Sequence, residues 1–510
     1  MKRKSNIYSI LSISALGIVA KVAGLLREGV VAAYFGTSAQ MDVFGLLSGY
    51  ATMLMAVIAG SLAISFSPYY ISDIQQRGEK MAAERFSHTL NQYVLFSFVF
   101  FLLVLAVSPW IADMVYKSST GVDRVIVLLY IRVLMATVIT GGMSRLFVSA
   151  LNGLRKYGWM QITQIFYSVI AILLTVILGS RYGVGVLVAA FVLNTVVQVS
   201  VLWAVFFREG RTYHFALGLK DNVTRESWKA VVPVFFGTEI YMLGLTIDRT
   251  VGLSLNMEGA AAALNYAGIL FGLINMVVTS PIGTVFNTEM YRNYYKTENR
   301  EVLFNDLGKI INHQSIVLLP IGLFLFASTS DFITVVLRRG AFDDHSVAMT
   351  AAAFCMYSLS APIYALRSVF TGVHIAMHDR MTPMWSGILF IVLNVGLSWA
   401  LSRFMGILGI TLGALCAMSA SFLYQYVSIQ KKYECRQKLF TKTYVKILFA
   451  ALLAALPVFV LSRIQIVSSP YLRLAVNAAL FCVIYAVCLQ MTRCEEFALL
   501  KQRMFKRNGK

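Results

Sequence analysis

Long apolar runs, separated by short polar segments, dominate the pattern of residues along this chain. A helix that crosses a bilayer core about 30 Å thick needs about 20 mostly apolar residues. A window of that length predicts fourteen spans, near residues 6–35, 41–69, 88–116, 125–151, 160–180, 184–207, 229–255, 259–286, 310–337, 347–374, 384–404, 407–428, 445–465 and 472–492. We therefore expect an all-α polytopic membrane protein.

The distribution of basic residues predicts the orientation of these spans. Cytoplasmic segments of membrane proteins carry an excess of lysine and arginine. An even number of spans places both termini in the cytoplasm together with the basic segments 2–4, 208–229, 431–446 and 493–510.

Three short segments need separate interpretation. The first twenty residues resemble a signal peptide, but the apolar pattern continues to Phe35, so we take this segment as the first span. Residues 77–85 and 292–309 mix charged and apolar residues. We expect both to form amphipathic helices at the inner membrane surface.

The composition agrees with a membrane protein and excludes several other classes. Apolar residues make up 58% of the chain, charged residues 13%, and the mean hydropathy is +0.71. The net charge of +20 is spread over short loops without a nucleic-acid-binding motif, so we expect no nucleic-acid partner. The six cysteines lack metal-ligand spacing, and no catalytic or nucleotide-binding motif occurs. We expect neither an enzyme nor a bound metal or cofactor.

The chain contains a weak internal repeat. A shift of 222 residues superimposes Arg27 on Arg249 and Arg145 on Arg367. Each repeat contains six spans, which is an even number, so the two halves would be parallel and the binding cavity would lie between them. The predicted organisation is an N-terminal six-helix lobe at 1–207, a cytoplasmic linker at 208–228, a C-terminal six-helix lobe at 229–430, two extra spans within 431–494, and a basic cytoplasmic tail at 495–510.

Basic residues inside the predicted spans indicate the function. A cation at the centre of a spanning helix costs at least about 2.5 kcal/mol, so such residues usually face water or a partner and mark a functional path. This chain has six, namely Lys21, Arg27, Arg132, Arg145, Arg249 and Arg367. The pattern predicts that the protein handles an anionic substance within the membrane.

Several motifs resemble one family of transporters. They are Lys21-Val-Ala-Gly24-Leu-Leu-Arg27-Glu28, Tyr34-Phe35-Gly36, Asp42-Val-Phe44, Ser67-Pro68, Arg339-Gly340-Ala341-Phe342 and Ala376-Met-His-Asp379-Arg-Met-Thr382-Pro383. In order and spacing they resemble the MurJ (MviN) family of lipid-linked oligosaccharide flippases in the MOP superfamily. The resemblance implies two lobes, a central cationic cavity with alternating access, and a groove beside the last two spans for a polyprenyl tail. It also implies lipid II, an undecaprenyl-diphosphate-linked peptidoglycan precursor, as the substrate.

The chain departs from the family pattern at five positions. The resemblance expects a basic residue at Met55, an acidic one at Ala59 and an arginine at Ile269. It also expects arginine where Lys21 stands and aspartate where Glu28 stands. These departures leave a teichoic, capsular or exopolysaccharide precursor as alternatives to lipid II.

The first span supplies the primary candidate site. A diphosphate diester carries about two negative charges, which hydrated cations can offset inside a membrane. Lys21 and Glu28 are seven residues apart and share a helix face, whereas Arg27 points about 120° away. We take Lys21 as the first phosphate ligand, with Glu28 either holding Lys21 or pairing with Arg27. The alternative is a Lys21–Glu28 pair that only joins helices.

The seventh span adds a second group. Arg249 is expected to bind substrate, and Glu239 and Asp248 to support it. Asp248 either binds a coupling ion or neutralises Arg249, although adjacent helical residues point about 100° apart and are not expected to form a tight pair.

Further candidates lie near the ends of other spans. Arg145 and Arg367 either guide the headgroup into an inward-facing mouth or snorkel to lipid headgroups. Asp42 begins the second span, where it either caps that helix or gates the outer mouth.

The preferred interpretation is a flippase in a bacterial inner membrane. It would be driven by membrane potential or by a coupling ion, Na⁺ or H⁺. Its partners would be the polyprenyl-linked glycan, membrane lipids, and proteins of cell-wall or exopolysaccharide synthesis. The alternatives are a MATE-like drug/ion antiporter and a flippase-derived scaffold that does not transport.

Overall fold

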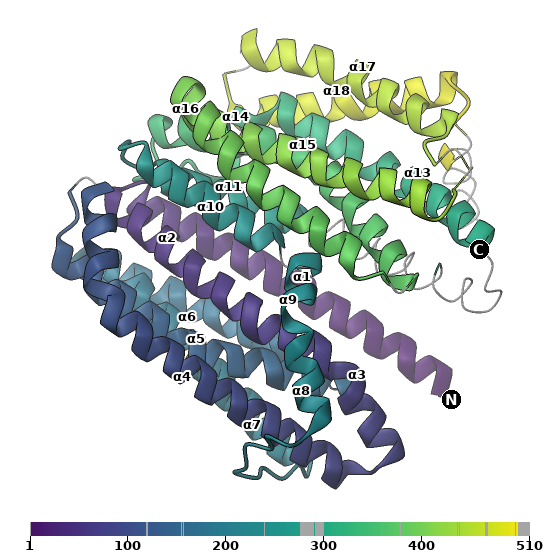
Figure 1. Ribbon diagram of the computed structural model, residues 1–510. Coiled ribbons are helices and arrows are strands. Elements are labelled where there is room, and N and C mark those ends of the chain that lie inside the picture. The colour runs from purple at the N-terminus through teal and green to yellow at the C-terminus, as the bar shows by residue number, and fades with distance from the viewer. Residues whose placement is uncertain are drawn as a thin grey trace. The chain divides into compact units, whose positions relative to one another are not determined.

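The structure is a computed structural model, and every regular element in its described part is a helix (Figure 1). The described residues are 2–118, 121–154, 156, 158–238, 240–275, 290, 300–377, 379–435, 437, 439–464, 468–494 and 496–497. By its contacts the chain forms two compact units. Unit 1 comprises Met1–Asn265 and Arg339–Asp343, and unit 2 comprises Tyr266–Arg338 and Asp344–Lys510.

Unit 1 is built around one central helix, α5, which packs against α2, α3, α4, α7 and the short π-helix η1, while α1 packs against α6. Two glycines of α5 allow this close packing. The hydroxyl of Tyr93 lies where a side chain at Gly142 would be, and the thioether of Met55 lies where one at Gly141 would be. The helices of unit 1 are α1 (Lys2–Phe35), α2 (Ala39–Leu54), η1 (Met55–Gly60), α3 (Ser61–Gln76), α4 (Glu79–Ser118), α5 (Arg124–Gly153), α6 (Trp159–Tyr182), α7 (Gly185–Arg208), α8 (Asn222–Lys229), α9 (Val231–Thr238), α10 (Ile240–Ser254) and the start of α11 (Ala260–Ile274).

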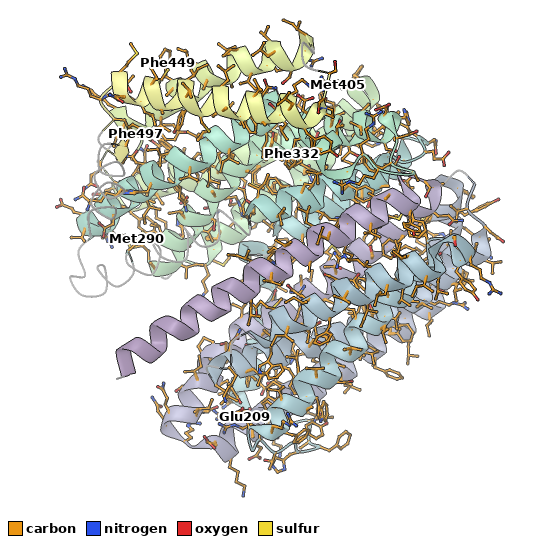
Figure 2. All side chains as sticks on the ribbon, turned by 180° about the vertical axis from the view of Figure 1, so that it is seen from behind. Glu209, Met290, Phe332, Met405, Phe449 and Phe497 are labelled. Atoms are coloured by element: carbon orange, nitrogen blue, oxygen red, sulfur yellow. The ribbon has the colours of Figure 1, made fainter. Side chains whose placement is uncertain are left out.

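Unit 2 is centred on α15, which packs against α13 and α16, while α17 packs against both α13 and α18. Apolar side chains of α17 such as Phe449 remain exposed, as expected of a surface that meets lipid (Figure 2). Besides the rest of α11, its helices are α13 (Arg300–Ala327), α14 (Thr329–Leu337), α15 (Asp344–Ala376), α16 (Met381–Lys432), α17 (Lys442–Ile464) and α18 (Pro470–Met491).

The structure confirms the all-α membrane fold. Ten helical segments of the described residues are long and apolar enough to cross a bilayer. The predicted count of fourteen spans stays a prediction, as do the lobe, linker and tail boundaries.

The predicted spans 384–404 and 407–428 both lie in α16, which is divided at Gly406, where the backbone is not helical and the φ of 56° suits glycine. Ser398 before this kink donates a hydrogen bond to the carbonyl of Ile410 after it at 2.9 Å, so the two predicted segments are separate helices that pack against each other. Other predicted element boundaries are corrected. The predicted span 310–337 is divided at Ser328 into α13 and α14. The surface helix expected at 77–85 is wrong, because α4 begins at Glu79 and continues without a break to Ser118. Of the one expected at 292–309, residues 300–309 are the start of α13, and residues 292–299 lie outside the described part.

Candidate functional site

The first candidate group lies on α1, at its contact with α6. Arg27 forms an ion pair with the adjacent Glu28, which is buried. The guanidinium of Arg27 also stacks over the ring of Tyr167 on α6, 4.5 Å from the ring centroid. Long side chains therefore bridge the rotation of about 100° between adjacent helical residues. Of the two roles predicted for Glu28, the structure shows pairing with Arg27.

Lys21 lies two turns before this pair on the same helix and is half-buried. Within the described part of the chain, no carboxylate forms an ion pair with Lys21, so the predicted Lys21–Glu28 pair is not formed. A lysine without a fixed ionic partner is a compact and mobile positive charge. Its predicted role as phosphate ligand stays a prediction.

The second group joins α10 to α2. Arg249 is only 8% exposed, and its Nη1 donates to the backbone carbonyl of Gly45 at 3.3 Å. The same guanidinium occupies the space that a side chain at Gly49 would need. Two glycines one turn apart on α2 therefore allow α10 to bring a cation against the backbone of α2.

Asp42 lies on α2 one turn before Gly45, and it caps the start of another helix, α11. Its Oδ2 accepts a hydrogen bond from the backbone N–H of Gly259 at 2.7 Å, and its Oδ1 accepts one from Ala262 at 2.6 Å. In return Glu258 accepts a hydrogen bond from the N–H of Ala39, at the start of α2. A carboxylate at a helix amino end satisfies open N–H groups and offsets the helix dipole. Asp42 thus ties the start of α2 to the start of α11.

Arg145 lies on α5 beside the π-helix η1. Its Nη1 lies 3.5 Å from the place where a Cβ atom at Gly60 would be. The two departures in this region have a packing explanation. Met55 and Ala59 both belong to η1 and are buried, and Met55 fills the space above Gly141. At both positions the chain has an apolar contact where the family resemblance expects a charge.

Arg367 belongs to unit 2 and lies in the interface between α15 and α16. It is 3% exposed, and its Nε donates to the hydroxyl of Ser421 at 2.9 Å. Ser421 is hydrogen-bonded to Ser386, which also accepts from Gln425 at 3.0 Å. This burial contradicts the predicted alternative in which Arg367 snorkels to headgroups. The structure places it in an internal polar cluster.

The remaining predicted residues have different outcomes. Asp248 is buried beside Arg249 in α10. Ile269 is partly buried on α11. Glu239 lies outside the described residues. Among the described residues, no group of three or more His, Cys, Asp or Glu side chains is placed to hold a metal ion.

Sequence reasoning missed two features of these sites. The partner of Arg27, Tyr167, gives no signal of its own because tyrosine is common in spans. Ser421 and Gln425 are four residues apart on α16 and so share a helix face, a polar pair within an apolar run that could have been noticed. Within unit 1, Arg249 of α10 contacts the backbone of α2, the helix that also contains Asp42.

Comparison with known proteins gives a consistent result. A family model described as lipid II flippase MurJ matches residues 31–476. The probable lipid II flippase MurJ of Rhizobium tropici is 23% identical over 448 residues, which cover 84% of this chain and 81% of that protein. The corresponding protein of Rickettsia prowazekii is 20% identical over 426 residues, covering 82% and 83% respectively.

Solved structures show the same fold. A lipid II flippase MurJ in an inward closed conformation aligns with a TM-score of 0.79 and 16% identity, covering 94% of this chain and 98% of that one. An inward-facing multidrug resistance MATE family transporter of the MOP superfamily aligns less well, with a TM-score of 0.62 and 17% identity, covering 82% and 96%. At these identities the likeness concerns the fold alone.

Proposed function

We propose that this chain, which belongs to the MurJ family of lipid II flippases, moves lipid II or a related undecaprenyl-diphosphate-linked glycan precursor across the bacterial inner membrane. Alternating access would expose the headgroup first to the cytoplasm and then to the outer face. The observation that carries the proposal is Arg249, a cation held almost fully buried against the backbone of a spanning helix. Such a charge is costly unless it serves an anionic partner or a path through the membrane.

The electrostatics of unit 1 support an anionic cargo. Lys21 and Arg27 lie on α1, Arg145 on α5 and Arg249 on α10, all within predicted spans of unit 1. Glu28 offsets the charge of Arg27, whereas Lys21 keeps a mobile charge two turns away. A mobile lysine can follow a moving phosphate, and arginine can grip one through two parallel hydrogen bonds. The diphosphate would thus exchange its water shell for fixed and mobile cations.

Asp42 supports the outer closure that alternating access requires. Its two hydrogen bonds to the start of α11 join elements more than 200 residues apart in the chain. They depend on the geometry of one carboxylate, so a small movement of α2 would break both. We infer that this cap holds the outer side closed and opens when the cargo is released.

The basic balance of the spans also separates this proposal from drug transport. The fold is shared with MATE transporters, so the fold does not decide between the two functions. A site for cationic drugs needs carboxylates, whereas the candidate positions of unit 1 carry four cations. Among their carboxylates, Glu28 is already paired with Arg27, and Asp42 accepts two backbone hydrogen bonds. A non-transporting scaffold would have no need for Lys21.

The test is a flipping assay in cells that depend on this protein. We expect Lys21→Ala and Arg249→Ala to reduce the fraction of lipid-linked precursor accessible at the outer face to the level of depleted cells. Arg181→Ala is a matched control, because Arg181 is an exposed cation at the end of α6, stacked on Tyr182. Normal flipping by both site variants would refute the site. Normal precursor exposure in depleted cells would favour the scaffold.

The location, energy source and partners are part of the same proposal. Both termini would lie in the cytoplasm, following the basic segments of the chain. Membrane potential or a Na⁺ or H⁺ gradient would drive the cycle, since each charge moved across 100 mV is worth about 2.3 kcal/mol. Proteins of cell-wall or exopolysaccharide synthesis would supply the cargo. Collapse of the potential and of each ion gradient in turn, with flipping as the readout, identifies the source.

A further inference from the structure

The segment between α7 and α8, residues 211–219, is held against α4 by side chains of that helix, and we call it the strap. The side-chain amide of Asn91 donates to the backbone carbonyls of His214 at 3.0 Å and Ala216 at 2.9 Å. The amide of Gln92 donates to the carbonyl of Leu217 at 2.6 Å. Three hydrogen bonds from two adjacent residues fix the register of the strap on α4.

Two more contacts hold the strap in place. The hydroxyl of Ser87 accepts a hydrogen bond from the N–H of His214 at 3.2 Å. Gly218 has a φ of +55° and lies against the ring of His88, with no room for a side chain. The strap is therefore a fixed part of unit 1, and its outward residues are set by the structure.

The residues that the strap presents outward are apolar. Phe215 is 92% exposed and Leu219 is 75% exposed. Leu217 between them is also exposed. Apolar side chains that a fixed backbone holds outward usually mark a surface that is covered by a membrane or by another molecule.

The position of the strap along α4 indicates a lipid surface. The exposed apolar row of α4 begins at Leu95 and Phe96, which face the bilayer in a spanning helix. Gln92, which holds the strap, lies three residues earlier, about 4.5 Å along the helix axis. Trp228 of α8 packs on Phe96 at 5.5 Å between ring centroids. The strap and α8 thus lie where α4 leaves the hydrocarbon. Figure 2 labels Glu209, which marks the end of α7 just before the strap.

The charges beside the strap suit anionic headgroups. Arg208, Lys220 and Arg225 flank it, and all three are exposed. Basic residues next to outward aromatic and aliphatic side chains are the usual composition of segments that lie in a membrane interface.

We propose that the strap is an interfacial membrane anchor for anionic lipid. Phe215 and Leu219 enter the boundary between headgroups and acyl chains, to a depth of about 5–10 Å. Arg208, Lys220 and Arg225 contact the anionic headgroups. The anchor would fix the linker that leads from α7 to α8 at the membrane surface. This inference is independent of the cargo and stands whether or not the protein flips lipid II.

The test measures the depth of single residues in a lipid nanodisc. The six native cysteines of the full-length protein are replaced, and a nitroxide is attached to Phe215→Cys in this background. Only variants that melt at the wild-type temperature are measured. Collisions with oxygen, which concentrates in lipid, are compared with collisions with a water-soluble nickel chelate. The matched control is His214→Cys, because His214 is the exposed polar neighbour of Phe215 on the strap. Leu219→Cys is the second site if Phe215→Cys does not fold.

We expect the labels at 215 and 219 to be several-fold more accessible to oxygen than to the nickel chelate, and the label at 214 to show the reverse. The depth should increase when phosphatidylglycerol is added to phosphatidylcholine discs. Lys220→Gln combined with Arg225→Gln, or high salt, should remove that increase. Labels at 215 and 219 that collide freely with the nickel chelate in both lipids would overturn the proposal. If the labels at 215 and 219 collide freely with the nickel chelate in both nanodisc lipids but are shielded from it in native membranes, the strap binds a protein partner instead of lipid.

Discussion

The guanidinium of Arg249 occupies the place that a side chain at Gly49 would need, so one glycine of α2 determines where a cation of α10 lies. The two residues are 200 positions apart in the sequence. The obstruction involves the far end of a flexible side chain, which can move without disturbing the backbone. A substitution at Gly49 can therefore move the guanidinium of Arg249 without destabilising the fold.

Gly49→Ala tests this relationship. We expect it to displace Arg249 and strongly reduce flipping, while thermal stability changes little because alanine favours a helix by about 1 kcal/mol over glycine. The measurements are precursor exposure in cells and melting of the purified protein. Gly396→Ala is the control, since Gly396 on α16 has open space around its Cβ position. Unchanged flipping by Gly49→Ala would show that the exact place of Arg249 is unimportant.

Asp42→Ala should destabilise the protein by about 1–2 kcal/mol, because two backbone N–H groups at the start of α11 lose their acceptor. Asp42→Asn should cost less, since an amide oxygen replaces one acceptor. Thermal unfolding in detergent measures both. Glu258→Ala is expected to have a smaller effect, as its single bond to Ala39 is 3.3 Å long. Equal effects of Asp42→Ala and Glu258→Ala would contradict this assignment.

Asp379, in the turn between α15 and α16, should make stability depend on pH. Burial opposes its ionisation, but hydrogen bonds from Lys432, Thr382 and Tyr433 outweigh burial and hold the pKa of Asp379 well below its usual range. Its protonation therefore favours the unfolded state. The stabilisation is complete above about pH 4, the usual aspartate pKa, and declines as the pH falls toward the lowered value.

The measurement for Asp379 is the difference in melting temperature between the wild type and Asp379→Asn. We expect a clear difference at pH 7 that becomes smaller at pH 3. Lys432→Gln should show part of the same change, because its Nζ lies 2.7 Å from the Asp379 carboxylate. A difference that is constant from pH 7 to pH 3 would be evidence against the role of ionisation.

Met55→Arg, which introduces the charge expected at this position from the family resemblance, should not improve function. Met55 is buried against Gly141, so an arginine would bring an unpaired charge into a packed contact and destabilise the protein by more than about 2 kcal/mol. Met55→Leu, of similar volume, should cost less than about 1.5 kcal/mol. Melting and membrane expression report both. A stable Met55→Arg protein with faster flipping would show that the position faces the cargo.

Arg367→Ala should lower stability by about 2 kcal/mol or more, since it leaves the internal polar cluster of α15 and α16 incomplete. Ser421→Ala, which removes one hydrogen bond, should cost about 1 kcal/mol. Flipping per folded molecule then separates the predicted substrate role from the structural one. Loss of flipping by Arg367→Ala at unchanged stability would restore Arg367 to the substrate path.

The sequence by itself determined the class of protein and the inventory of charges. Hydropathy over about 20 residues is a local property, and hydrocarbon excludes any spanning structure other than a helix or a closed barrel, so the all-α membrane fold followed directly. A cation inside a long apolar run is also visible without knowledge of its neighbours, which is why Lys21, Arg27 and Arg249 were selected as candidates from position alone.

Only the tertiary structure decided the partner of each charge. Glu28 could reach two cations, and the packing of α1 on α6 determined that it pairs with Arg27. Asp42 accepts a hydrogen bond from the N–H of Gly259, 217 residues after it, where no local pattern points. Arg367 and Arg145 occupy matching positions in the repeat, yet one is enclosed by α16 and the other lies beside a π-helix. Contacts between helices depend on how side chains fill the space between them, and that information is distributed over the whole chain.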